Sequence, residues 1–375
     1  MQHLTTIAKL SELAEARRCI GTLLRRPPFN TEASFPVISR WARSIGERNP
    51  FFLDSGYASR SRVGTLVAPP CWLYSVDNTA IAVRFPDLHA IYGGTSWEFY
   101  RWVRSGERIV TFARLLDVQE KASSFAGRMI VERGEVLYVN GKGERLARAV
   151  STILRTPRDK AREIGKYSNW ERYKYTREDL IRVEDSYDAE QIRGSEPRYW
   201  EDVKTKDTLQ PVVKGPLSSE DMLEFIGATC PTMAFRRFAE LRVRHPGIAF
   251  KSDETGQWES WDASILDERV AHRFGFPFAH DAGIDRIAWI GSMLTNWMGD
   301  DGFLRSLDVR LILPSVLKDT TWCKGRVAAK SQESGESLVT CEVWCENQRG
   351  WITAKGTAVV SLPSRGGHHP LLAGH

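Results

Sequence analysis

Two parts of this chain repeat the same order of elements, and this repeat limits the folds that the chain can adopt. Each copy begins with an apolar stretch of helical spacing and continues with long segments that have the pattern of β-strands. The first copy contains APPCWLYSV (68–76), GRMIVERGEVLYVN (127–140) and LARAVSTIL (146–154), and the second contains GIDRIAWIGSMLTNWMG (283–299), SLVTCEVWCEN (337–347) and ITAKGTAVVSL (352–362). The order predicts two similar units, each with one central helix followed by a meander of strands.

Hydrophobic periodicity assigns the elements of the second copy. Apolar and polar side chains alternate along SLVTCEVWCEN, which is the period of a half-buried strand. Between Ile284 and Met298 apolar side chains recur at steps of three and four, which predicts a helix, and Gly299 predicts its end. An antiparallel sheet with one apolar face needs a cover. We therefore expect an α+β fold of two tandem antiparallel sheets, each wrapped around a central helix.

Shifts in composition suggest the domain boundaries. The polar and charged segment between the two units is rich in turn residues, and it is typical of a connector that wraps over a surface. We predict a helical extension at 1–35, a first unit at 36–155, the connector at 156–215, a second unit at 216–363 and a flexible tail at 364–375.

Composition excludes several classes of protein. The 375 residues carry 52 Lys and Arg against 47 Asp and Glu, a net charge of +5 that is spread along the chain. A nucleic-acid-binding protein would show a denser basic stripe, whereas a mild excess suits an anionic small molecule. No stretch approaches the roughly 20 apolar residues of a membrane helix, and the first residues lack a signal-peptide core. We expect a cytoplasmic protein without nucleic-acid or membrane partners.

The cysteines and histidines give no sign of a metal or disulfide framework. The six cysteines are scattered, no CxxC pair occurs, and no Cys/His cluster has zinc spacing. Reduced thiols and no metal site are therefore expected.

Several motifs resemble those of the MaoC-like dehydratases, the R-specific enoyl-thioester hydratase family with the hot-dog fold. The resemblance covers 36–363 and is strongest to the double hot-dog branch, whose first half is a dehydratase domain of the fatty-acid-synthase type. The motifs are RWARSIGERNP (40–50), APP (68–70), GGTSWEF (93–99), RGSEPRYWED (193–202), DERVA (267–271), GFP (275–277) and NWMGDDG (296–302). The resemblance implies a double hot-dog fold and chemistry on an acyl thioester.

The family performs its chemistry with an Asp and a His in a G-D-x-N-P-x-H segment, and with a backbone N–H at the start of the central helix. In the first half Glu47 replaces the Asp and Phe52 replaces the His. Pro69 and Pro70 begin the helical stretch, and proline has no N–H to donate. The resemblance therefore implies a catalytically silent first half that shapes a tunnel for the acyl tail.

In the second half, the family's His position aligns with Ile265 and its Asp position with Ser260, so the usual pair is absent. The helix start survives at Gly283, which would supply the oxyanion N–H. His280, Asp281 and a shifted Asp262 are the candidates for proton transfer.

Four further residues are candidates for binding the substrate. Asp285 lies near the start of the predicted helix, and Trp289 is one of several tryptophans in the second half. Glu47 and Asn49 occupy the motif of the first half, where ordering of their own loop is the simpler role.

Three functions remain open. The chain could add water to an enoyl thioester or remove it from a 3-hydroxyacyl thioester. It could instead be a noncatalytic acyl-CoA-binding subunit of a hetero-oligomeric hydratase, or a recruited biosynthetic enzyme with a different reaction at the same oxyanion site. No cofactor is expected beyond the coenzyme A or acyl-carrier phosphopantetheine of the substrate. The expected assembly is a homodimer or a hetero-oligomer with another hot-dog protein.

Overall fold

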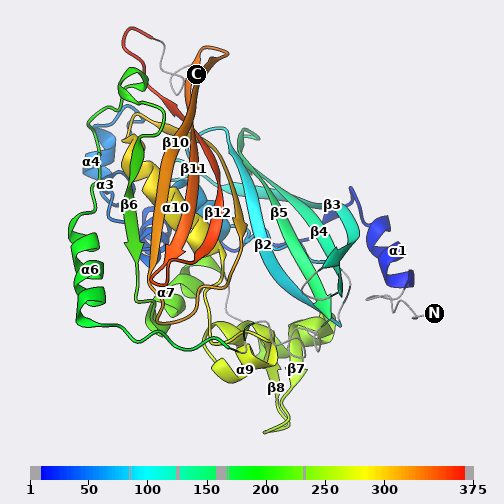
Figure 1. The fold of residues 1–375 in the computed structure, drawn as a ribbon. Coiled ribbons are helices and arrows are strands. Elements are labelled where there is room, and N and C mark those ends of the chain that lie inside the picture. Colours follow the sequence, from blue (N-terminus) through cyan, green and yellow to red (C-terminus); the bar gives the residue numbers. More distant parts are fainter. Residues whose placement is uncertain are drawn as a thin grey trace.

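The computed structural model describes residues 10–83, 85, 87–123, 127–157, 167, 169–230 and 234–367. Residues 1–9 of the predicted extension, 158–166 and 168 of the predicted connector, and 368–375 of the predicted tail lie outside the described residues. Figure 1 shows the strands side by side, with the second half around a long helix and the N-terminal helix beyond the far edge of the first half.

The strands form one continuous antiparallel sheet. The strands of the first half are β1 (Leu23–Leu24), β2 (Leu88–Phe99), β3 (Ile109–Ser123), β4 (Gly127–Asn140) and β5 (Arg145–Pro157). Those of the second half are β6 (Thr208–Lys214), β9 (Phe303–Leu311), β10 (Thr321–Glu333), β11 (Glu336–Asn347) and β12 (Ile352–Leu362). Their order across the ten-stranded sheet is β1-β3-β4-β5-β2-β9-β12-β11-β10-β6.

The two predicted sheets meet at the pair β2–β9. These strands run antiparallel, with Thr95 opposite Val309 and Trp97 opposite Leu307. Both are therefore interior strands of the combined sheet, and neither leaves an unpaired edge between the halves. The α+β fold expected from the repeat is confirmed, and the union of its two sheets into one is an addition that the sequence pattern did not contain.

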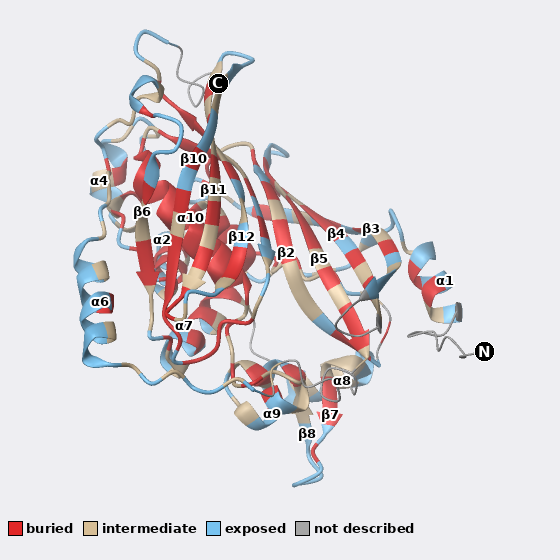
Figure 2. Ribbon diagram, viewed as in Figure 1, coloured by how far each residue is buried: buried red, intermediate tan, exposed pale blue. Residues whose placement is uncertain are grey.

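The central helix of the second half is α10 (Ile284–Met298), and every one of its 15 residues is buried. A helix that is apolar on most sides is stable only where other elements surround it. The strands β9 to β12 and β6 surround α10, and Figure 2 shows it buried along its whole length. Gly283 and Gly299 flank the helix with φ angles of +80° and +75°. The predicted start and end of this helix are confirmed.

The corresponding stretch of the first half is shorter than the sequence pattern suggests. It forms the 3₁₀ helix η1 (Pro70–Ser75), with Pro69 at its N-cap. η1 packs against α10, and Cys71 Sγ lies 3.9 Å from the carbonyl oxygen of Ile287. The first half thus contacts the second through its central segment as well as through β2.

The other helices lie around the sheet and between its halves. They are α1 (Leu10–Arg18), α2 (Phe35–Ser44), α3 (Pro50–Leu53), α4 (Ser55–Ser59), α6 (Arg177–Asp188), α7 (Ser219–Thr229), α8 (Phe235–Arg244) and α9 (Glu268–Arg273), with the 3₁₀ helices η2 (Trp200–Asp202), η3 (Pro246–Ile248) and η4 (Trp261–Ile265). The short strands β7 (Ala249–Lys251) and β8 (Trp258–Ser260) pair as a hairpin beside α9.

The predicted connector contributes to the second half of the sheet. Within it, α6 packs along β6, and β6 pairs with β10 at the edge. Thr176 caps α6, because its side chain accepts from Asp179 N–H while the Asp179 carboxylate accepts from the Thr176 N–H. Among the described residues, no helix is both long and apolar enough to cross a membrane.

Candidate active site at the start of α10

The segment before α10 is held in place by pairing with the loop that follows β9. The Asp281 N–H donates to the Ser315 carbonyl at 2.8 Å, and the Leu317 N–H donates to the Ala279 carbonyl at 2.9 Å. These bonds fix the chain on both sides of His280. The side chains of His280, Asp281 and Asp285 therefore have defined positions at the N-terminal end of a buried helix.

Gly283 is required by the way the chain enters α10. Its φ of +80° lies in the left-handed region, which residues with a side chain rarely adopt. A Cβ at this position would also lie 2.6 Å from Leu311 Cδ1. The first turn of a helix leaves backbone N–H groups without partners inside the helix, and its dipole favours an anion. The dipole of α10 would therefore favour a developing oxyanion near its start.

Asp281 forms a buried ion pair with Arg286. Arg286 Nε lies 2.5 Å from Asp281 Oδ2, and both side chains are almost completely inaccessible to solvent. The same guanidinium donates from Nη1 to the carbonyl oxygens of Leu313 and Thr353, each at 2.7 Å. Arg286 therefore neutralises Asp281 and also ties α10 to the ends of β9 and β12.

Asp285 is the second carboxyl group of the cluster, and it is 1% exposed. Its Oδ1 accepts the Arg286 N–H at 2.9 Å. Burial, and then the charge of Asp281, raise the pKa of Asp285 well above its ordinary value. The raised pKa favours the protonated form of Asp285, beside the carboxylate of Asp281 that pairs with Arg286.

His280 is held as a neutral base. Its Nδ1 lies 2.7 Å from the Asp281 carbonyl oxygen, which can only accept, so Nδ1 carries the proton and donates it. Nε2 then has a free lone pair, and it has no hydrogen-bond partner among the described residues. Burial lowers the pKa of His280, more than its bond to Asp281 raises it. A neutral imidazole with a free Nε2 can remove a proton from water.

Aromatic rings cover this cluster. Phe276 lies against His280, with ring centroids 4.2 Å apart. Tyr167 stacks on Phe276 at 6.4 Å, and Trp170 contacts both Tyr167 and Trp351. Burial raises the pKa of Tyr167, while the charge of Arg286 lowers it. These rings limit the access of solvent to His280, which is half-buried.

Of the predicted catalytic residues, the structure brings together His280, Asp281 and Gly283, but not Asp262. Asp262 is exposed in η4, where its N–H donates to Ser260 Oγ, and its charge acts on Cys230. Ile265 ends the same 3₁₀ helix. The segment that would carry the family's acid/base pair is thus occupied by a capping serine and an apolar side chain.

The predicted substrate-binding residues fall in two places. Asp285 belongs to the cluster, and Trp289 is buried one turn further along α10. Glu47 instead fastens the first half to α10. Its Oε1 accepts the N–H groups of Arg48 and Asn49, each at 2.9 Å, and its Oε2 accepts Ser292 Oγ–H at 2.7 Å. Asn49 caps α3 through the Phe51 N–H. These contacts give Glu47 and Asn49 a positioning role.

Arg286 is the functional residue that the sequence interpretation missed. An arginine inside an apolar stretch, directly after Asp285 and five residues after Asp281, was the available signal, since a buried charge needs a partner. In the described part of the chain, no three His, Cys, Asp or Glu side chains are placed to hold a metal ion together.

Comparisons with known proteins agree with this architecture. Residues 28–149 match the family model described as FAS1-like, dehydratase domain region. A UPF0336 protein of Streptomyces griseus is 28% identical over 107 residues, which are 26% of this chain and 69% of that protein. The solved structure of a MaoC-like dehydratase superposes with a TM-score of 0.64 at 15% identity, over 93% of this chain and all of the other. A Mycobacterium tuberculosis protein described as having a double hot-dog fold gives a TM-score of 0.57 at 10% identity, over 92% and 96% of the two chains.

These matches confirm the resemblance to the dehydratases. Residues 28–149 match a FAS1-like dehydratase region, and the chain as a whole has a double hot-dog fold like that of the solved structures.

Proposed function

We propose that this chain adds water to, or removes it from, an acyl thioester at the N-terminal end of α10. The observation that carries the proposal is the Nε2 of His280, which has no hydrogen-bond partner among the described residues, near the buried carboxyl group of Asp285, whose pKa is raised. One group can take a proton and another can give one, which is what hydration of a double bond requires. The thioester would be carried by coenzyme A or by an acyl-carrier phosphopantetheine.

The residues have distinct roles in this reaction. His280 Nε2 takes a proton from water as the water oxygen bonds to C3 of the enoyl group. The electron pair of the double bond moves toward the thioester oxygen, whose charge the N–H groups near Gly283 stabilise. Asp285 then gives its proton to C2, and the imidazolium returns its proton to the carboxyl pair. Dehydration is the same sequence in reverse. Because Phe276 lies on His280, its ring must move when the substrate enters.

The pH dependence of turnover tests the base. The purified chain would be assayed with enoyl-CoA esters from short linear to bulky cyclic, as wild type and as His280→Gln. A general base contributes roughly 100-fold or more to the rate, so His280→Gln should lose about that factor. Since burial lowers the pKa of His280, wild-type turnover should stay high to a pH below the ordinary histidine range and then fall.

His245 provides a matched control, because it is an exposed histidine outside the cluster. His245→Gln should keep the wild-type rate and pH profile. If His280→Gln keeps both as well, His280 is not the base.

A specific observation also favours a noncatalytic subunit. The carboxylate of Asp281 is paired with Arg286, and Ser260 and Ile265 stand where the family has its acid/base pair. In this alternative the chain binds an acyl thioester and contributes to a hetero-oligomer with a second hot-dog protein, whose own Asp/His pair performs the reaction. It predicts that the chain alone is inactive on every ester, and that His280→Gln leaves the activity of the complex unchanged.

A further inference from the structure

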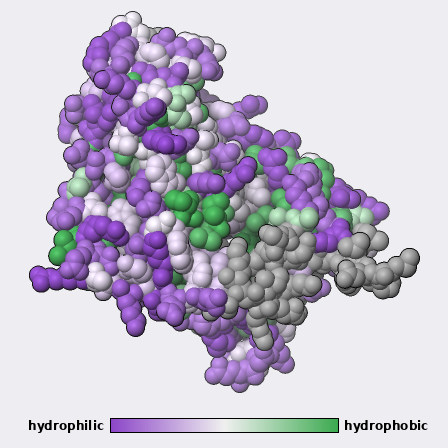
Figure 3. Space-filling model, in the orientation of Figure 1, coloured by the Kyte–Doolittle hydropathy of each residue, from purple (hydrophilic) through white to green (hydrophobic). Residues whose placement is uncertain are grey.

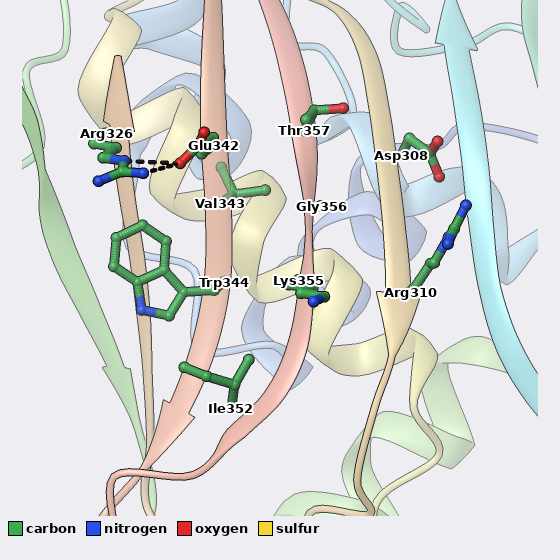
Figure 4. A pocket seen from close by; sticks show the side chains of 10 residues that line it. All are labelled: Asp308, Arg310, Arg326, Glu342, Val343, Trp344, Ile352, Lys355, Gly356 and Thr357. Atoms are coloured by element: carbon green, nitrogen blue, oxygen red, sulfur yellow. Dashed lines mark hydrogen bonds and ion pairs between the residues drawn. The ribbon is translucent and has the colours of Figure 1, made fainter. Parts of the chain in front are cut away.

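The second half of the sheet carries a groove on the face opposite α10. The groove has a volume of about 600 Å³ and lies over β9, β10, β11 and β12. In Figure 4 its side chains stand in front of the strands while α10 lies behind them. The sheet therefore separates this outer groove from the His280 cluster. Figure 3 shows the same side of the molecule as mainly hydrophilic, with apolar side chains gathered near the centre of the view.

Strand register puts three large side chains of the groove in one row. Trp344 on β11 is directly opposite Lys355 on β12, and Lys355 is directly opposite Arg310 on β9. Side chains at directly opposite positions of antiparallel strands are close neighbours on the same face. The row thus begins with an aromatic ring and continues with two cations.

The two cations form no ion pair among the described residues. Lys355 and Arg310 are both exposed, and neither has a carboxylate within ion-pair distance in the described part of the chain. By contrast, Arg326 pairs with Glu342 at 2.6 Å, and Lys324 pairs with Glu346 at 2.9 Å, on the same face. Like charges directly opposite each other destabilise a sheet. This repulsion would be relieved by an anion between Lys355 and Arg310.

Trp344 offers a flat apolar surface at the other end of the row. Figure 4 shows its ring reaching toward β10, above Ile352, while Arg310 extends from the far side of the groove and Lys355 stands between them. Glu342 and Arg326 lie next to the ring, where their polar atoms can meet the edge of a bound heterocycle. Indole faces stack well on planar bases.

We propose that the outer groove binds a nucleotide, with its base on Trp344 and its phosphate between Lys355 and Arg310. The volume lies within the range of small-molecule sites, about 300–1,000 Å³. Asp308, which also lines the groove, can accept hydrogen bonds from ribose hydroxyls. The inference does not depend on the reaction proposed for His280, because the groove lies on the other face of the sheet.

Free adenine nucleotides and the adenosine phosphate end of coenzyme A share this chemistry. Calorimetric titration of the full chain with AMP, adenosine, inorganic phosphate and coenzyme A distinguishes them. AMP should bind more tightly than either adenosine or phosphate, because each of these lacks one half of the contacts. If coenzyme A competes with AMP, the natural ligand is the adenosine phosphate end of coenzyme A. If coenzyme A does not compete, the natural ligand is a free nucleotide.

Three variants test the residues. Trp344→Leu should weaken AMP binding about fivefold or more, which corresponds to the lower end of base–aromatic stacking. Lys355→Gln and Arg310→Gln should each weaken AMP binding and leave adenosine binding unchanged. Lys142→Gln removes an exposed lysine from a turn of the first half and should change nothing. Because Lys355→Gln also removes the repulsion, its melting temperature without ligand should equal or exceed that of wild type.

Two results would overturn the proposal. One is no AMP binding at millimolar concentration by folded wild-type chain. The other is AMP binding of equal affinity in wild type, Trp344→Leu and Lys355→Gln.

Discussion

Replacement of Arg286 by methionine is the most informative perturbation of the α10 cluster. The guanidinium pairs with Asp281 at 2.5 Å and gives two hydrogen bonds of 2.7 Å to the Leu313 and Thr353 carbonyls. Methionine fills similar space but leaves a buried carboxylate and two carbonyls without these donors. Loss of one partner of a buried ion pair costs about 3–5 kcal/mol. We expect Arg286→Met to lower the free energy of unfolding by about that amount at pH 7.

The loss should depend on pH in a defined direction. Without its cation, buried Asp281 favours the protonated form, so the folded state binds a proton that the unfolded state releases near neutral pH. The free energy of unfolding of Arg286→Met should therefore recover as the pH falls toward the ordinary pKa of an aspartate side chain. Urea unfolding at pH 7 and pH 5 measures both effects.

Arg365→Met is the matched control. Arg365 pairs with Asp202 at 2.6 Å, but both side chains are about half exposed. Exposed pairs contribute about 0–1 kcal/mol. If Arg286→Met loses no more stability than Arg365→Met, the buried Asp281–Arg286 pair does not stabilise the folded state by the expected amount.

Three further changes have distinct expected results. Asp285→Asn should flatten the pH dependence of stability above pH 4, because the raised pKa of Asp285 makes the wild type lose stability as the pH rises. If the free energy of unfolding in urea changes with pH as it does in wild type, the pKa of Asp285 is not raised. Gly283→Ala should lower the free energy of unfolding by about 1–2 kcal/mol, because alanine is strained at φ +80°. An unchanged unfolding midpoint would contradict a left-handed conformation at residue 283. Ser292→Ala should lower the free energy of unfolding by about 1–3 kcal/mol, because it leaves one oxygen of buried Glu47 unpaired. Ser59→Ala, on the exposed helix α4, is the control and should have almost no effect.

Periodicity predicted the second half better than the first. The alternation in SLVTCEVWCEN and the three- and four-residue steps up to Met298 gave β11 and α10, because both elements bury one consistent set of apolar positions. APPCWLYSV had the same helical spacing, but it forms only the 3₁₀ helix η1. The union of the sheets through β2 and β9 depends on pairing between distant strands, which local patterns do not encode.

The candidate site was predicted in part, because neighbours in sequence at a helix start are also neighbours in space. His280, Asp281, Gly283 and Asp285 were found in this way. Asp262 was proposed on the assumption of a shifted loop, and the structure places it in η4 on the surface. The role of Glu47 is a contact with Ser292 across 245 positions of sequence, which no spacing rule could indicate.

The most direct test of the proposed activity is incorporation of ¹⁸O from labelled water into 3-hydroxyacyl-CoA by the purified chain alone. Wild type and His280→Gln would be compared on the same panel of enoyl-CoA esters by mass spectrometry. The account predicts label at C3 with wild type on at least one ester and roughly 100-fold less with His280→Gln. Absence of label with every ester, or equal rates for the two proteins, would contradict catalysis by the His280 cluster.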